Sequence, residues 1–171
     1  MADFNPAFDI MIRNEGGYQL TNVAGDRGGQ TYAGIARNMH PEWPGWRIID
    51  RGDMGNLELS QLVRDFYKAN YWDRVSGDGI SRQAIAESIF DFAVNAGPAV
   101  AAKLAQLVVG AVPDGRIGPK TLDALNALEE GVFVLKYAIA KVARYAEICN
   151  KDRSQSKFLL GWINRTMKGL A

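Results

Sequence analysis

Apolar residues recur at every third or fourth position through most of the chain, which is the spacing of an amphipathic α-helix. The first such stretch covers residues 5–13, with Pro6 at a position where a helix can begin. Its apolar face consists of Phe4, Phe8, Met11 and Ile12. Regular spacing then stops after Glu15 for roughly twenty residues, which is long for a connection inside a folded domain.

The later part of the chain is dominated by the same helical spacing. It predicts helices within 55–72, from Ser81 as N-cap to a stop at Gly97, from Pro98 to near Gly110, from Pro119 to Leu125, and over 132–150 and 156–168. Strand signals are weak, and only 19–23 and 31–35 could pair, as one short hairpin. We therefore expect a mostly α fold with at most a small β-hairpin after the first helix.

No flexible linker or internal repeat separates these helices, so we expect a single domain over residues 1–171. The stretch 95–128 is expected to form a compact helical part of this domain. It follows the part formed by 1–94 and precedes the C-terminal helices of 129–171.

The composition excludes several classes of protein. No apolar run is long enough to span a membrane, so we expect no stable membrane insertion. Cys149 is the only cysteine and His40 the only histidine, which excludes an intramolecular disulfide and a zinc site of the usual kind. The first six residues contain an acid and a proline instead of the basic and apolar segments of a secretory signal.

Charge is distributed unevenly, although the net charge of the whole chain is only +1. Residues 136–168 contain eight Lys or Arg residues and two acidic ones, a net charge of +6, so the remainder carries −5. Such a basic segment favours binding to anionic surfaces, including cell-envelope polymers. It also fits the solvated face of ordinary surface helices.

The end of the first helix carries a candidate catalytic acid, Glu15. The C-terminus of a helix bears partial negative charge, which disfavours an ionised carboxylate and favours a protonated one. A carboxyl group that keeps its proton near neutral pH is what general acid catalysis requires. Gly16 and Gly17 allow the chain to turn sharply and leave space beside the carboxyl group. The alternative is a surface glutamate that happens to precede a glycine stop.

Two further groups in the following loop could complete a catalytic site. Asp26 and Thr31 come eleven and sixteen residues after Glu15 and are flanked by glycines. Glycoside hydrolysis uses one carboxyl group to protonate the leaving oxygen and a second to activate water or to stabilise the sugar cation. Thr31 could hold the attacking water. Asp26 could instead cap its own backbone in a turn.

The chain resembles the N-acetylmuramidases of glycoside hydrolase family 108, with motifs spread over nearly its whole length. The matching segments, in the family's order, are EGGY (15–18), DRGGQTYAGI (26–35), YKANYWD (67–73), FDFAVNAGP (90–98), DGRIGPKTLDAL (114–125) and GWINR (161–165). The resemblance implies a lysozyme-like fold. It also implies that the DGRIGPKTLDAL segment belongs to a peptidoglycan-binding part, integrated into the C-terminal helices.

The resemblance places the family's catalytic glutamate on Glu15. In the wider lysozyme-like superfamily, Asp26 and Thr31 match the second and third members of a Glu-Asp-Thr arrangement. The segment before Asp26 departs from the family, because it has Gly25 where a proline is usual. Asp50 and Asp53 are therefore alternative candidates for the second carboxylate.

Candidate substrate-binding residues come from the polar and aromatic positions near these motifs. Sugar rings present apolar faces, which exposed aromatic side chains with a polar tip can cover. Tyr18, Tyr32 and Trp46 are such candidates, and Trp46 lies with Trp43 in a segment interrupted by prolines. Asn95 could hydrogen-bond to a substrate amide or hydroxyl. The alternatives are core packing for the aromatic residues and helix capping for Asn95.

The sequence therefore predicts a peptidoglycan hydrolase that cleaves the β-1,4 bond between N-acetylmuramic acid and N-acetylglucosamine, without cofactor or metal. By resemblance it would be a phage endolysin, made without a signal peptide in the bacterial cytoplasm and released to the cell wall by a holin. A host-encoded relative of the secretion-activator type is the alternative origin. We expect a monomer whose partner is bacterial peptidoglycan and not a nucleic acid. A lytic transglycosylase and a non-catalytic peptidoglycan-binding module remain as alternatives.

Overall fold

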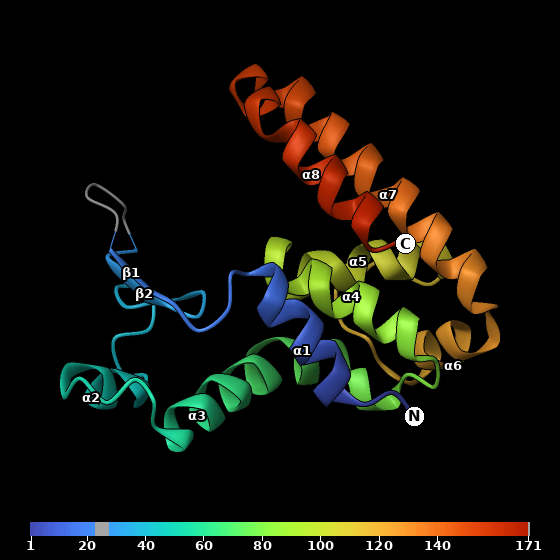
Figure 1. Cartoon of the computed structure of the whole chain (residues 1–171). Coiled ribbons are helices and arrows are strands. Elements are labelled where there is room, and N and C mark those ends of the chain that lie inside the picture. The colour runs from blue at the N-terminus through green and yellow to red at the C-terminus, as the bar shows by residue number, and fades with distance from the viewer. Residues whose placement is uncertain (23–27, 171) are drawn as a thin grey trace. The chain divides into compact units, whose positions relative to one another are not determined.

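Helices account for most of the chain in the computed structural model, which describes residues 1–22 and 28–170 (Figure 1). A small three-stranded sheet follows the first helix, which confirms the predicted mostly α class. Packing divides the chain into two compact units, one formed by 4–70 and the other by 1–3 with 71–171.

The unit formed by 4–70 contains the sheet and three helices. Its elements are α1 (Phe4–Asn14), β1 (Leu20–Asn22), β2 (Gln30–Tyr32), β3 (Ile35–Ala36), α2 (Gly45–Asp50) and α3 (Leu57–Tyr67). The strands are antiparallel in the order β1-β2-β3, with Leu20 opposite Tyr32 and Thr21 opposite Thr31. This pairing confirms the predicted hairpin, whereas β3 was not predicted.

The turn between β2 and β3 is held by a contact with α3. Ala33 and Gly34 both have positive φ, +49° and +80°, as a tight two-residue hairpin turn requires. The Tyr67 hydroxyl donates to the Ala33 carbonyl at 2.9 Å. A β-carbon on Gly34 would collide with the Tyr67 hydroxyl oxygen. Glycine at position 34 is therefore required by both the backbone angle and the space available.

The apolar face of α1 packs on α3, as its spacing predicted. Phe8 is fully buried, and its ring lies edge-on to the Tyr67 ring at 5.9 Å. The Arg64 guanidinium covers the Phe8 ring at 4.4 Å and donates to Asp9 at 3.0 Å. One arginine thus closes the solvent side of this contact by a cation–π interaction and an ion pair.

The segment that was expected to be an irregular, proline-interrupted loop contains a short helix. Pro44 is the N-cap residue of α2, and Trp46 follows within the first turn. This helix was not predicted, because its six residues are too few for the apolar spacing of a helix to appear.

The second unit is built almost entirely of helices. A π-helical stretch (Lys68–Trp72) leads into it, followed by short 3₁₀ turns and by α4 (Gln83–Ala96), α5 (Pro98–Val109), α6 (Pro119–Ala127), α7 (Glu130–Lys151) and α8 (Ser156–Lys168). The predicted helices agree with these, except that the N-cap of α4 is Arg82 and not Ser81. Ser81 instead donates to the Asn126 side chain through its N–H and its hydroxyl.

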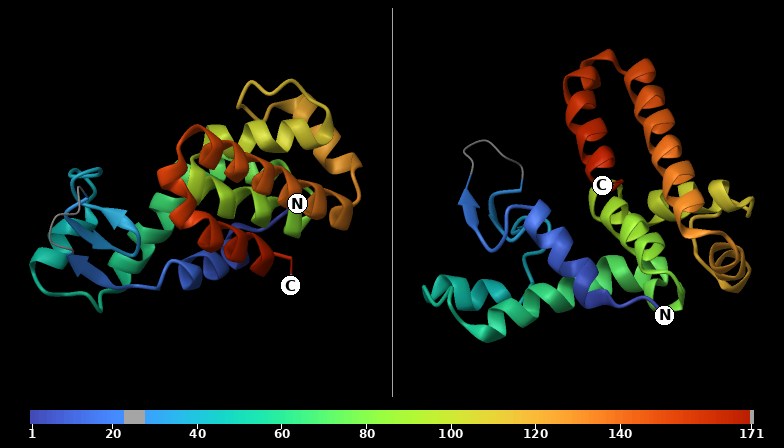
Figure 2. Two further views of the ribbon diagram at one scale, coloured as in Figure 1. Left: turned by 90° about the horizontal axis from the view of Figure 1, so that it is seen from above. Right: turned by 45° about the vertical axis from the view of Figure 1, so that its right-hand side comes forward.

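The core of this unit lies between α4, α5 and α7, and α8 lies antiparallel to α7 (Figures 1 and 2). Phe133 and Tyr137 of α7 stack within this core, and the Tyr137 hydroxyl donates to the Ala101 carbonyl at 3.0 Å. Because α5 contacts both α4 and α7, the helices of 95–128 are continuous with the rest of the unit.

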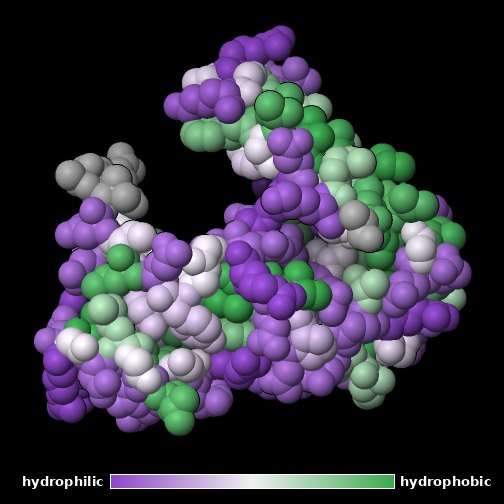
Figure 3. All heavy atoms as spheres, in the orientation of Figure 1, coloured by the Kyte–Doolittle hydropathy of each residue, from purple (hydrophilic) through white to green (hydrophobic). Residues whose placement is uncertain are grey.

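A second, exposed apolar stripe follows the outer side of α7, where green side chains gather in Figure 3. The residues of this stripe are Val132, Leu135, Ile139 and Val142. They recur at three- and four-residue spacing on the face of α7 opposite to part of its buried residues.

Candidate active site

Glu15 is the C-cap residue of α1. The N–H of Gly16 donates to the Arg13 carbonyl at 3.3 Å. The N–H of Gly17 donates to the Ile12 carbonyl at 2.8 Å. This pair of bonds is a Schellman motif, in which the residue after the C-cap takes a left-handed conformation, and Gly16 has φ +91°. The sequence thus fixes the half-buried Glu15 at the point where the helix ends and the chain turns.

The glycine pair leaves open space on one side of Glu15, as the sequence suggested. A β-carbon at Gly16 or Gly17 would have no neighbour within 4 Å among the described residues. Gly17 also has positive φ, +77°. The negative end of the α1 dipole points to the same region, so the carboxyl group lies at the end of the helix and beside this open space.

Thr31 lies in the middle of β2 within the same compact unit as Glu15. It is half-buried and faces Thr21 across the β1–β2 pair, where the Thr21 hydroxyl donates to the Thr31 carbonyl at 3.4 Å. Asp26 lies outside the described residues. Its predicted role as the second carboxylate stays a prediction.

The aromatic candidates differ in exposure. Tyr18 is 42% exposed, and its ring lies 6.5 Å from the ring of Tyr32. Burial raises the pKa of the Tyr18 hydroxyl, so this group remains a hydrogen-bond donor at neutral pH. Tyr32 is only 2% exposed and stacks on Trp43 at 6.4 Å. Of this pair, Tyr18 is the one whose surface is accessible to a ligand.

Trp46 has its ring faces occupied by protein. It is 3% exposed, lies edge-on to Trp43 at 5.2 Å, and is covered by the Arg37 guanidinium at 5.0 Å. Its indole N–H donates to the His40 carbonyl at 2.8 Å. This geometry corresponds to the alternative interpretation, core packing, and leaves no free ring face for a sugar.

The two alternative acids already have partners. Arg37 donates to both oxygens of Asp50, at 2.8 and 2.6 Å, and these bonds lower the pKa of the Asp50 carboxyl. Asp53 accepts from the Asn56 side chain at 2.8 Å, and Asn56 is the N-cap of α3. Both carboxylates therefore support local structure. The Arg37–Asp50 pair was not apparent from the sequence, because its two residues lie thirteen positions apart.

Asn95 belongs to the other compact unit, near the end of α4. It is exposed, and its side-chain amide donates to the Asp91 carbonyl at 2.7 Å, one turn earlier. This bond is the local, helix-bound alternative considered for Asn95. The Asp91 carboxylate in turn binds Arg165 of the GWINR segment at 2.9 Å, which ties two of the family-like motifs together.

Two residues important for this geometry were not singled out as site residues by sequence reasoning. Tyr67 fixes the β2–β3 turn, and Arg37 connects Gln30 of β2 to Asp50 through donated bonds. The glycine of the YAGI segment, Gly34, was the available sequence signal for the turn that Tyr67 fixes.

Within the described ranges, no three His, Cys, Asp or Glu side chains gather as a metal site. The helices there are also too short or too polar to cross a membrane.

Comparisons with known proteins place these features in context. The family model described as Glycosyl hydrolase 108 matches residues 8–97, and the model described as Predicted Peptidoglycan domain matches residues 100–167. Among solved structures, the chain is similar to the one described as "Structure of Brucella abortus SagA", with 29% identity and a TM-score of 0.74. The match covers 98% of this chain and 91% of that chain. A search of curated proteins found no match.

Proposed function

The chain belongs to the glycosyl hydrolase 108 family of peptidoglycan hydrolases and carries a peptidoglycan-binding domain, and from this premise we propose that it is an N-acetylmuramidase. It hydrolyses the β-1,4 bond between N-acetylmuramic acid and N-acetylglucosamine. The observation that carries the proposal is the position of Glu15, which closes α1 beside open space at the glycine pair.

Glu15 is the general acid in this proposal. Its carboxyl group donates a proton to the glycosidic oxygen as the bond to the sugar breaks. A water molecule held by Thr31 and activated by Asp26 completes the hydrolysis. Tyr18, which is exposed and protonated, is proposed to contact the sugar.

The substitution Glu15→Gln tests the acid. It preserves the shape of the side chain but removes the transferable proton, and general acid catalysis typically contributes about 10²–10⁴-fold to the rate. Release of soluble fragments from purified peptidoglycan should therefore fall by at least about a hundredfold. Glu42→Gln, which changes an exposed glutamate in the same unit, is the matched control. Near-normal turnover by a folded Glu15→Gln protein would refute the assignment.

Mass spectrometry of the fragments tests the reaction type. Reducing muramic acid ends support hydrolysis, 1,6-anhydro ends indicate a lytic transglycosylase, and an intact glycan indicates a binding module. We also propose that the protein acts as a phage endolysin. Cytoplasmic expression should then lyse bacteria when a holin is co-expressed and leave them intact without one.

A further inference from the structure

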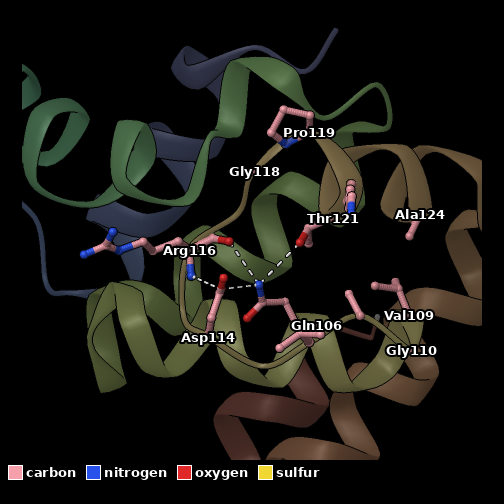
Figure 4. Close-up of a pocket in the computed structure, with 12 residues that line it drawn as sticks. Gln106, Val109, Gly110, Asp114, Arg116, Gly118, Pro119, Thr121 and Ala124 are labelled. Atoms are coloured by element: carbon pink, nitrogen blue, oxygen red, sulfur yellow. Dashed lines mark hydrogen bonds between the residues drawn. The ribbon is translucent and has the colours of Figure 1, made fainter.

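A cavity of about 690 Å³ opens in the second unit, between the end of α5, the loop of 110–118 and the first turns of α6 (Figure 4). The loop contains the DGRIGP segment. Neither Glu15 nor any other proposed catalytic residue lines this cavity, because those residues belong to the other unit. The cavity is therefore distinct from the candidate active site.

One buried glutamine holds the wall of the cavity in place. Gln106 is 1% exposed, and its amide donates to the Asp114 carboxylate at 2.7 Å and to the Arg116 carbonyl at 3.0 Å. Its carbonyl oxygen accepts from the Gly115 N–H at 2.9 Å. Figure 4 shows the two bonds that the Gln106 amide donates to Asp114 and to the Arg116 carbonyl. Because Gln106 bonds to three positions of the loop, the wall of the cavity is held in one arrangement.

Part of the lining is small and apolar. It includes Val109, Ala111, Val112, Pro119 and Ala124. None of the described residues that line the cavity is aromatic. A sugar needs an aromatic platform or many free hydrogen-bonding groups to replace its water. This lining has no aromatic platform, and its Gln106 amide is already bonded to the loop. Methyl-sized side chains, in contrast, match it in size and polarity.

Charges of both signs lie at the cavity. The Gln106 amide and the Arg116 N–H bond to Asp114 and lower the pKa of its carboxyl, so that it is ionised at neutral pH. Lys120, an exposed residue in the first turn of α6, adds a basic side chain to the lining. The Arg116 side chain points away from Gln106 and Thr121 in Figure 4. A ligand with both an amino and a carboxylate group fits this arrangement.

We propose that this cavity binds the peptide stem of peptidoglycan and not its glycan strand. The stem is a short peptide with alanine methyl groups, free carboxylates and, at its diamino acid, an amino group. The inference rests on the proposed function, because it takes peptidoglycan as the substrate. It adds that the second unit recognises the peptide, while the Glu15 unit acts on the sugar chain.

The direct test is titration of the free stem tetrapeptide into the whole protein, followed by isothermal calorimetry and by amide chemical shifts. We expect binding, with the largest shifts in 106–124. Peptidoglycan from which an amidase has removed the stems should retain much less protein than intact peptidoglycan. Equal retention on both materials, or no binding of the tetrapeptide, would overturn the proposal.

A filled cavity should bind the peptide poorly. Ala124→Phe places a ring in the hollow, whereas Ala127→Phe adds the same ring at an exposed position of α6 outside the lining. We expect Ala124→Phe to raise the Kd for the tetrapeptide by about tenfold or more, and Ala127→Phe to leave it nearly unchanged. Circular dichroism confirms that each variant is folded. The same Kd for both variants would refute the site.

A surface substitution that does not threaten folding gives an independent answer. Lys120→Gln should weaken peptide binding several-fold, and Arg74→Gln, which changes an exposed basic residue of the same unit outside the cavity lining, should not. Release of reducing ends at saturating peptidoglycan reports separately on Glu15. If reducing ends are absent but the tetrapeptide binds, the muramidase proposal fails and the cavity assignment stands. If reducing ends appear but the tetrapeptide does not bind, the cavity assignment alone fails.

Discussion

Lys141 shows how the environment of a single residue can act against stability. It is 7% exposed in α7, lies 4.8 Å from the Tyr137 ring, and its ammonium group is 3.3 Å from the Ser88 hydroxyl. Burial lowers its pKa from 10.5 to about 8, although Asp91 partly opposes this change. Because the folded pKa lies below the unfolded one, the unfolded chain binds more protons between about pH 8 and pH 10.5, and stability rises with pH in that window.

Replacement of this lysine by an apolar side chain of similar length should therefore stabilise the protein at neutral pH. We expect Lys141→Met to raise the free energy of unfolding at pH 7 by roughly 1–3 kcal/mol, since the desolvation of a buried charge is removed. The advantage should shrink as the pH approaches 10, where the wild-type lysine is neutral. Urea unfolding of both proteins at pH 7 and pH 10 measures this, with Lys136→Met as an exposed control. A gap that is constant or grows with pH would contradict the argument.

The identity of the second carboxylate is also decided at the residue scale. If Asp26 activates water, Asp26→Asn should lower turnover by at least about a hundredfold, with little loss of peptidoglycan binding. Asp50→Asn and Asp53→Asn should have smaller effects, because those carboxylates are bonded to Arg37 and Asn56. Near-normal turnover by the Asp26→Asn protein would exclude it as the base.

The stereochemistry of the product tests the same mechanism. A threonine next to the proposed base would be suited to holding a water molecule, so we expect inversion and a separation of roughly 6.5–9.5 Å between the two carboxyl groups. Proton NMR of the first-formed product should then show the α-anomer. A β-anomer would indicate retention, for which the separation is about 5–5.5 Å.

The sequence predicted that Glu15 lies at the end of the first helix, because this position depends on neighbouring residues only. Its catalytic role stays a prediction. The helix before it and the two glycines after it are visible in the sequence, and the Schellman motif follows from them. The packing of Trp46 depends instead on Arg37 and Trp43, whose contacts the sequence does not display. Its exposure could not be settled from residue type.

At the scale of elements, the turn between β2 and β3 depends on a residue more than thirty positions away. Gly34→Ala should destabilise the protein by about 2–4 kcal/mol, because alanine resists positive φ and its β-carbon meets the Tyr67 hydroxyl. Tyr67→Phe removes that oxygen, so the double variant should lose less stability than the sum of the single variants. The free energies of unfolding of the four proteins are measured by urea unfolding. Additive losses would show that the Tyr67 hydroxyl is not what prevents a β-carbon at position 34.

The same dependence explains which elements the sequence predicted. The helices from α3 to α8 have enough turns for apolar spacing to appear, and Pro98 and Pro119 mark two of their starts. The two residues of β3 have no pattern of their own and are defined by pairing with β2. The π-helical stretch Lys68–Trp72 continues the spacing of α3, so it was read as the same helix.

At the scale of the whole molecule, the family matches and the packing divide the chain differently. The glycosyl hydrolase match ends at residue 97 and the peptidoglycan domain match begins at 100, close to the predicted functional division at 94–95. The peptidoglycan domain match also covers both 95–128 and 129–171 almost completely. Packing instead separates 4–70 from the helices that follow. The family matches therefore place the boundary near residues 97–100, whereas packing places it at residues 70–71.

The distribution of charge between these regions predicts how the protein binds its substrate. Residues 136–168 carry a net charge of +6, whereas the rest of the chain carries −5. The peptidoglycan domain match includes this basic segment up to residue 167. Peptidoglycan presents carboxylates, so part of its binding to this region should be electrostatic. Exposed charges are screened over about 10 Å at 0.1 M salt, so this part of the binding should weaken as salt is added.

Retention on purified peptidoglycan should therefore fall between about 0.05 and 0.5 M NaCl. Neutralisation of five exposed basic residues in the segment should remove most of this salt dependence. The five changes to Gln are at Lys136, Lys151, Arg153, Lys157 and Lys168. A control variant makes the same change to five exposed arginines elsewhere, Arg13, Arg47, Arg51, Arg74 and Arg82. The two variants have equal net charge, so a difference between them in a pull-down assay reports the position of the charge. Equal salt dependence in both would mean that only the total charge matters, and the basic segment would then have no specific part in binding.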